Sequence, residues 1–203
     1  MRGLRPASHL STQEIDAVVE AAERAVLIEC SRRTGKTIFL KGGMGSDVPQ
    51  ALIAGGKVVG RSGEAELVAR VLLPDTDLNA GAVAYDQWLT AALVAATEYQ
   101  YVGPALQLRT DQVAAIYGVG TLDAAPHVGR VRLLTGTSVV MAAWDTTPIW
   151  AAQDTLGYAD EFAMWSVQEN INVWLMPYAA SAGERFILLG VIAEPKGTGP
   201  ITK

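Results

Sequence analysis

Few residues of this chain have the types and spacing that chemistry requires, and the sharpest short pattern is Gly35-Lys36-Thr37. A nucleotide-binding loop of the Walker type ends in this triplet, but it begins with a glycine so that its backbone can wrap the phosphates. Cys30 stands at that first position, and the residues before it have the pattern of a helix. We therefore interpret the triplet as a basic turn after a helix, and we expect no nucleotide cofactor.

The segment Asp75–Gly81, DTDLNAG, places oxygen-bearing side chains at alternating positions, as a calcium-binding loop does. Such a loop closes with a glutamate that binds the ion through both oxygens, and only Asp86-Gln87 stands nearby. His9 and His127 are the only histidines, too few for a histidine-built metal centre. We interpret the segment as a turn before the next element, and we expect no metal site.

Nucleophilic catalysis requires a base within hydrogen-bond reach of the nucleophile, and the sequence pairs no such residues. His127 stands in a loop flanked by proline and glycine, and we expect it at the surface. Cys30 lies near a helix C-terminus, which disfavours a thiolate, so we expect an inert thiol. Four glutamates border the last strands, where charges usually protect edges and turns. They are Glu161, Glu169, Glu184 and Glu194. We expect no catalytic residues and no enzyme activity, and an enzyme of unknown chemistry stays a minor alternative.

Tryptophans can stack on sugars, and the chain has five of them. They are Trp88, Trp144, Trp150, Trp165 and Trp174. A sandwich core or a subunit interface uses indoles in the same way, with the ring nitrogen bonded at the edge. We favour core or interface, and we keep a small carbohydrate- or ligand-binding β-barrel lined by tryptophans as the alternative.

Composition narrows the classes of function further. Of the 203 residues, 50% are hydrophobic and only 18% are charged, below the usual quarter for soluble domains. The formal net charge of −5 argues against coating nucleic acid, which requires a basic face. No run reaches the length of a membrane-spanning helix, and no secretory signal pattern opens the chain.

The elements that must position any site begin with a helix. Ser11-Thr12-Gln13-Glu14 is a capping box, in which the Ser11 hydroxyl and the Glu14 carboxylate each accept a backbone amide of the other residue. Apolar residues recur at helical spacing behind it, which predicts an amphipathic helix over residues 12–31. We expect residues 1–10 to be an N-terminal arm, residues 11–194 a single β-rich domain and residues 195–203 a C-terminal tail.

Three apolar runs of strand length fill Glu161–Glu194, separated by turn-forming residues. They are Phe162–Val167, Ile171–Tyr178 and Phe186–Ala193. The last run is apolar on both faces, whereas a strand with one wet face alternates. Both faces must therefore be covered, either by a second sheet and the helix of this chain or by another subunit.

Further short strands are expected along the chain, with clear hairpin patterns at 51–60 and at 128–144. Ala82–Thr97 is ambiguous between helix and strand, and its alanines favour a helix. The pattern predicts a mainly β fold, an antiparallel β-sandwich or jelly-roll-like barrel preceded by the amphipathic helix.

Four observations together suggest a structural, self-assembling subunit. The charge content is low, the last strands are apolar on both faces, the termini resemble arms, and no catalytic constellation is visible. We expect a virion protein such as a viral or phage capsid subunit, a homo-oligomer that contacts other virion proteins, assembled in a host cytoplasm. Outside a virion we expect a cytoplasmic protein, with no small-molecule ligand. The expected interface residues are Phe162, Trp165, Trp174, Met176, Phe186, Leu188 and Ile192.

Overall fold

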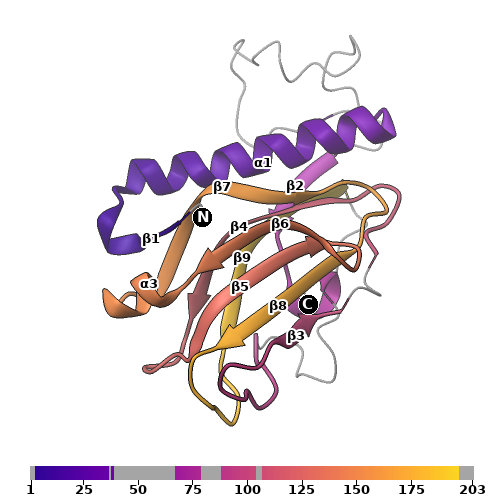
Figure 1. Cartoon of the computed structure of the whole chain (residues 1–203). Coiled ribbons are helices and arrows are strands. Elements are labelled where there is room, and N and C mark those ends of the chain that lie inside the picture. The colour runs from indigo at the N-terminus through magenta and orange to yellow at the C-terminus, as the bar shows by residue number, and fades with distance from the viewer. Residues whose placement is uncertain (1–2, 37, 39–66, 79–87, 104–106, 197–203) are drawn as a thin grey trace.

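The computed structural model describes residues 3–36, 38, 67–78, 88–103 and 107–196 (Figure 1). The hairpin expected at 51–60 lies outside them. The helices are α1 (Thr12–Thr34), α2 (Pro74–Asp77) and α3 (Thr147–Ala151), and a 3-10 turn covers Ala7–His9. The strands are β1 (Leu4–Pro6), β2 (Leu67–Val71), β3 (Tyr99–Val102), β4 (Val113–Thr121), β5 (Val128–Thr135), β6 (Val139–Asp145), β7 (Leu156–Trp165), β8 (Ile171–Pro177) and β9 (Phe186–Pro195).

The described strands form two antiparallel sheets. One has the order β1-β7-β4-β9-β2, and the other has the order β3-β8-β5-β6. Helix α1 crosses one face of the five-stranded sheet, and the four-stranded sheet covers the other face (Figure 1). The predicted mainly β, sandwich-like fold with an amphipathic helix before it is confirmed, but the two sheets do not close into a barrel.

Helix α1 begins at Thr12, as the sequence predicts, and it runs to Thr34, past the predicted end at residue 31. The Glu14 amide donates to the Ser11 hydroxyl at 3.3 Å, and the Ser11 amide donates to the Glu14 carboxylate at 2.8 Å. This reciprocal box satisfies two amides that the first helical turn leaves without partners. At the other end Gly35 adopts a left-handed φ of 70°, and its amide closes the last turn on the Ser31 carbonyl.

Strand β9 explains why the last apolar run lacks a polar face. Leu189, Val191 and Ala193 pack with α1, whereas Phe186, Leu188 and Ile192 belong to the core between the two sheets. Both faces are covered within one chain, so the doubly apolar pattern requires no second subunit. The hairpin of β5 and β6 also lies where the sequence predicts it, with Gly136 at a φ of 62° in its turn.

Two expectations are corrected. The described part of Ala82–Thr97, from Trp88 onward, is not helical: Leu89 bridges to Arg185 and Leu93 to Ser181, and a turn follows at Ala95-Ala96. Alanine's helix propensity is a weak preference. Here it is overridden by hydrogen bonds to residues 177–185, a neighbouring segment of the same chain. The expected N-terminal arm is packed on the domain in its described part, since Leu4–Pro6 pairs with β7 and Leu4 is buried.

Candidate interaction site

The Gly35-Lys36 pair occupies a helix end and not a phosphate loop. Gly35 is the C-cap of α1, and the Lys36 ammonium lies 3.6 Å from an Asp111 carboxylate oxygen. Thr37 lies outside the described residues. A Walker loop requires a strand before the triplet and a helix after it, and α1 stands in the wrong place for that arrangement. The sequence interpretation of a basic turn after a helix fits this geometry.

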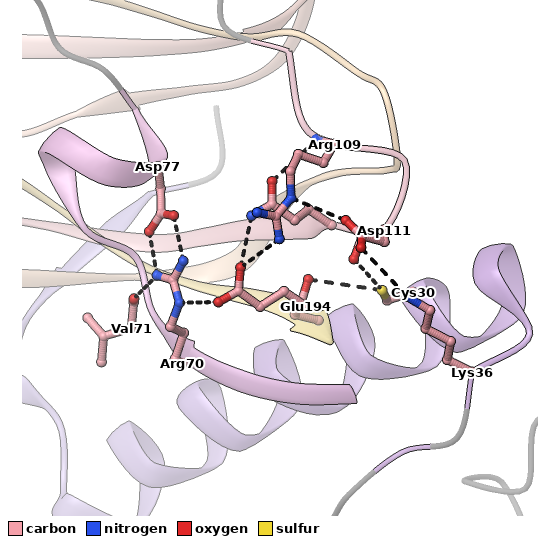
Figure 2. Close-up of polar contacts among 10 residues, drawn as sticks. Cys30, Lys36, Arg70, Val71, Asp77, Arg109, Asp111 and Glu194 are labelled. Carbon is pink, nitrogen blue, oxygen red and sulfur yellow. Dashed lines mark hydrogen bonds and ion pairs between the residues drawn. The ribbon is translucent and has the colours of Figure 1, made fainter. Parts of the chain in front are cut away.

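A group of charged side chains surrounds Glu194, the one acidic residue of β9 (Figure 2). One carboxylate oxygen of Glu194 accepts from Arg70 Nε at 2.6 Å, and the other accepts from Gln112 Nε2 at 2.9 Å and from Arg109 at 3.3 Å. Arg70 also forms a bidentate pair with Asp77, at 2.6 and 2.7 Å. The Glu194 side chain is only 2% exposed, so this group is an internal clamp that joins β2, α2 and β9.

Each charged side chain of this clamp is hydrogen-bonded to a side chain of opposite charge. Burial acts to lower the pKa of Arg70, but its hydrogen bonds to Asp77 and Glu194 outweigh burial and hold that pKa above its ordinary value. Asp77 also accepts the Leu73 amide at 2.7 Å, which fixes the turn at α2. The carboxylate that the sequence placed in a possible calcium loop is therefore bound to a guanidinium. Within the described residues no group of three His, Cys, Asp or Glu side chains could hold a metal ion.

Cys30 lies beside the clamp, and its thiol is buried (Figure 2). Its sulfur donates to the Asp111 carbonyl at 3.4 Å. Burial raises the pKa of Cys30 to about 11, and the nearby Asp111 charge acts in the same direction. A thiol of that pKa carries almost no thiolate near neutral pH, which agrees with the inert residue expected from sequence.

Glu184 is a second buried carboxylate, which the sequence placed only as a charge at the end of a strand. Its oxygens accept from the backbone amides of His127 and Val128, at 2.7 and 2.9 Å, and lie 3.2 Å from His127 Nδ1. The Tyr178 ring packs against the His127 ring, and its hydroxyl donates to the Pro126 carbonyl. This geometry anchors the loop before β5. The view of Glu184 and Glu194 as strand-end charges that protect edges is wrong, because both are buried.

Most of the tryptophan side chains are buried or partly buried within the fold. Trp144 and Trp165 are buried between the two sheets, and Trp165 donates to the Leu134 carbonyl at 2.9 Å. Trp150 and Trp88 are partly buried against the same core, and Trp150 donates to the Val128 carbonyl. A buried indole cannot stack on a sugar, so Trp144 and Trp165 are unsuited to the carbohydrate site considered from sequence.

The residues expected at an interface lie in different parts of the fold, some in the core and some nearer the surface. Trp165, Phe186, Leu188 and Ile192 lie in the core between the sheets and are not available to a partner. Phe162 packs against the α1 cluster, while Trp174 and Met176 are half-buried on the face of β8 opposite its core residues. The last strands are apolar because the chain covers them itself, and the surface open to a partner lies elsewhere.

That surface is the outer edge of β6. Strand β6 ends the four-stranded sheet, and none of the described strands pairs with its free side. Val139, Val140 and Met141 are 60%, 49% and 36% exposed, which makes them the largest run of exposed apolar side chains among the described residues. An edge strand presents unpaired backbone donors and acceptors, and proteins usually protect such edges with charge, proline, a bulge or a short length. Only Asp145, at its last position, is charged.

A bulge in β7 shapes the surface next to this edge. Ile116 of β4 pairs with Ala163 and Gly118 with Tyr158, so Tyr117 alone opposes the four-residue segment Ala159–Phe162.

The bulge lines two grooves, and bulges of this kind often redirect side chains at functional surfaces. A groove of about 290 Å³ lies between the bulge and β6, and one of about 500 Å³ lies between the bulge and α1. The first is lined by Val140, Met141, Ala142, Ala143, Trp144, Glu161 and Phe162. The second is lined by Arg5, Glu14, Ala17, Val18, Ala21, Ala159, Asp160, Glu161 and Phe162.

The groove beside α1 is charged at its rim, with Arg5 held 2.8 Å from Asp160 and 3.5 Å from Glu14. In the described part of the chain, the helices are too short or too polar to cross a membrane. Comparison of the chain with protein-family models, with curated proteins and with solved structures gave no match.

Proposed function

We propose that this chain is a structural subunit that works by self-assembly. The observation that carries the proposal is the free edge of β6, which exposes Val139, Val140 and Met141 and bears no charge before Asp145. A free apolar edge binds another chain through backbone hydrogen bonds and apolar contact together. In a protein with a well-packed core of its own, such an edge is a surface for partners.

The setting we propose for this assembly is a virion, with the chain as a capsid or other shell subunit. Low charge content supports it, because much of a shell subunit's surface faces its neighbours rather than water. A compact sandwich supports it too, since rigid subunits with defined edges assemble with defined angles. The charged groups described above are bound within the fold, and their arrangement favours a structural role over a catalytic one.

The proposal is tested by the mass of the full chain in solution, measured by light scattering and native mass spectrometry. We expect a discrete oligomer, a multiple of the 21.5 kDa chain. A strictly monomeric protein at micromolar to millimolar concentration would contradict the proposal. Val140→Lys should reduce the mass, because a charge on an edge strand opposes pairing. Val71→Lys is the matched control, since Val71 is 66% exposed on β2 at the edge of the other sheet.

A further inference from the structure

We propose that β6 pairs with β6 of a second copy of this chain, antiparallel and across a twofold axis at Met141. The two four-stranded sheets would then join into one continuous sheet. This inference rests on the proposed function, because it names the partner and the surface of the self-assembly.

The charge pattern of the strand favours a second copy as the partner. The chain is acidic, with a net charge of −5, so two copies meet most favourably where neither is charged. From Leu133 to Trp144 no residue is charged. An axis at Met141 sets Val139 against Ala143 and Val140 against Ala142 of the partner. Apolar side chains of modest size then meet apolar side chains, as favourable cross-strand pairs require.

The one charge of the strand fits the same arrangement. Asp145 is aligned with Arg130 on the neighbouring strand β5 of its own sheet. Across the proposed axis Asp145 falls opposite Thr137, so neither copy's Asp145 meets a like charge on the paired strand. A twofold contact is isologous, which means that one patch must complement itself, and an uncharged antiparallel edge does so through its backbone.

The other described edges are less suited to pairing. Strand β1 has three residues and ends in Pro6, which has no amide donor. Strand β2 carries Arg70, and its Leu67 is already bridged by Ile38. Strand β3 has only four residues and an irregular register. The part of β7 beyond β1 includes the acidic bulge residues Asp160 and Glu161.

Strand β6 does contain one irregularity, at the position of the proposed axis. Ala142 pairs with Leu133 and Val140 with Leu134, so Met141 is an extra residue in β6. A bulge is one of the features that can protect an edge by twisting it away, and here it stands without charge or proline beside it. An axis at Met141 leaves the regular residues on either side free to pair.

A charge-swap experiment tests the axis directly. Met141→Lys and Met141→Glu each place two like charges together at the axis, so each variant alone should lose the contact that β6 makes and run at a lower mass. Mixing the two folded variants in equal amounts should restore the wild-type mass, because the ammonium introduced in one copy then meets the carboxylate introduced in the other. This rescue is specific to a contact in which residue 141 faces itself. Folded variants that stay dissociated when mixed would overturn the inference.

Cysteine cross-linking gives a second readout that does not depend on the charged variants. Met141→Cys, oxidised in the full chain, should form a disulfide-linked dimer at least tenfold more than Val71→Cys does. The native Cys30 is buried and stays in both variants, so the wild-type chain shows its background. An oligomeric Met141→Cys protein that cross-links no better than the Val71 control would overturn the inference while leaving the proposed function intact. A monomeric wild-type chain would overturn both.

Discussion

At the scale of single residues, the notable feature is that the chain buries carboxylates and satisfies each of them. Glu194 accepts from two arginines and a glutamine, and Glu184 accepts from two backbone amides and lies 3.2 Å from a histidine ring nitrogen. Burying an ion costs several kcal/mol, and only close, complete pairing offsets that cost. Such groups are sensitive points for stability, because the loss of one partner leaves the other charge uncompensated.

We therefore expect Glu194→Gln to lower the free energy of unfolding by ~3 kcal/mol, since Arg70 and Arg109 lose their shared anion. Urea unfolding at pH 7, followed by circular dichroism, measures the change. Asp160→Asn is the matched control, because its ion pair with Arg5 is about half exposed, and it should change stability by less than ~1 kcal/mol. Equal effects of the two variants would contradict the view of Glu194 as the centre of an internal clamp.

At the scale of elements, α1 is attached to the sandwich by polar contacts as well as by its apolar face. Glu29 accepts from Arg33 at 2.7 Å, from Arg32 at 2.8 Å and from the Ser166 hydroxyl at 2.9 Å. Ser166 follows β7, so one carboxylate links the last turns of the helix to the five-stranded sheet. Burial acts to raise the pKa of Glu29, but these hydrogen bonds outweigh it, and the pKa lies below its ordinary value.

This shift predicts a pH dependence with a definite sign. A pKa that is lower in the folded state gives stability that is present above the unfolded value, near 4.5, and lost as the pH falls through the folded value. Glu29→Gln should therefore cost about 1 kcal/mol at pH 7 and progressively less below pH 4.5. Urea unfolding of both proteins between pH 7 and pH 3 measures the difference.

Glu20→Gln provides the control for that series, because Glu20 pairs with Arg24 on the exposed face of the same helix. Its effect should stay within about 0.5 kcal/mol at every pH. If the cost of Glu29→Gln were independent of pH, the carboxylate would not be the group that attaches the helix.

At the scale of the whole molecule, the layers determine which surfaces are left for partners. Helix α1 and the four-stranded sheet cover both faces of the five-stranded sheet (Figure 1). The apolar side chains of the last strands are therefore buried within one chain. Among the exposed surfaces is a side of the sandwich, where β6 ends its sheet and the β7 bulge opens two grooves.

If the native state is an assembly, its thermal unfolding must depend on protein concentration. A partner that binds only the folded chain stabilises it by mass action. For a dimer of this size we expect the unfolding midpoint to rise by about 2 °C for each tenfold increase in concentration. Differential scanning calorimetry over two decades of concentration measures this slope. Met141→Lys should remove it, and a flat wild-type profile would contradict assembly.

The sequence by itself determined the features that depend on neighbours along the chain. The capping box fixes the start of α1 because Ser11 and Glu14 are one turn apart. Gly136 permits the turn between β5 and β6, and the doubly apolar run of β9 shows that both of its faces are covered. Each of these depends on local backbone preference or on periodicity, which a reader of the sequence can evaluate directly.

Only the tertiary structure decided what depends on strand order and on partners distant in sequence. Glu194 is buried because Arg70, 124 residues earlier, lies on the adjacent strand β2. The segment after Trp88 is not helical because the chain at 177–185 offers it hydrogen bonds, and Met141 is exposed because β6 ends its sheet. Which strand becomes an edge is set by the free energy of packing the whole chain, a sum over distant contacts that no local pattern contains.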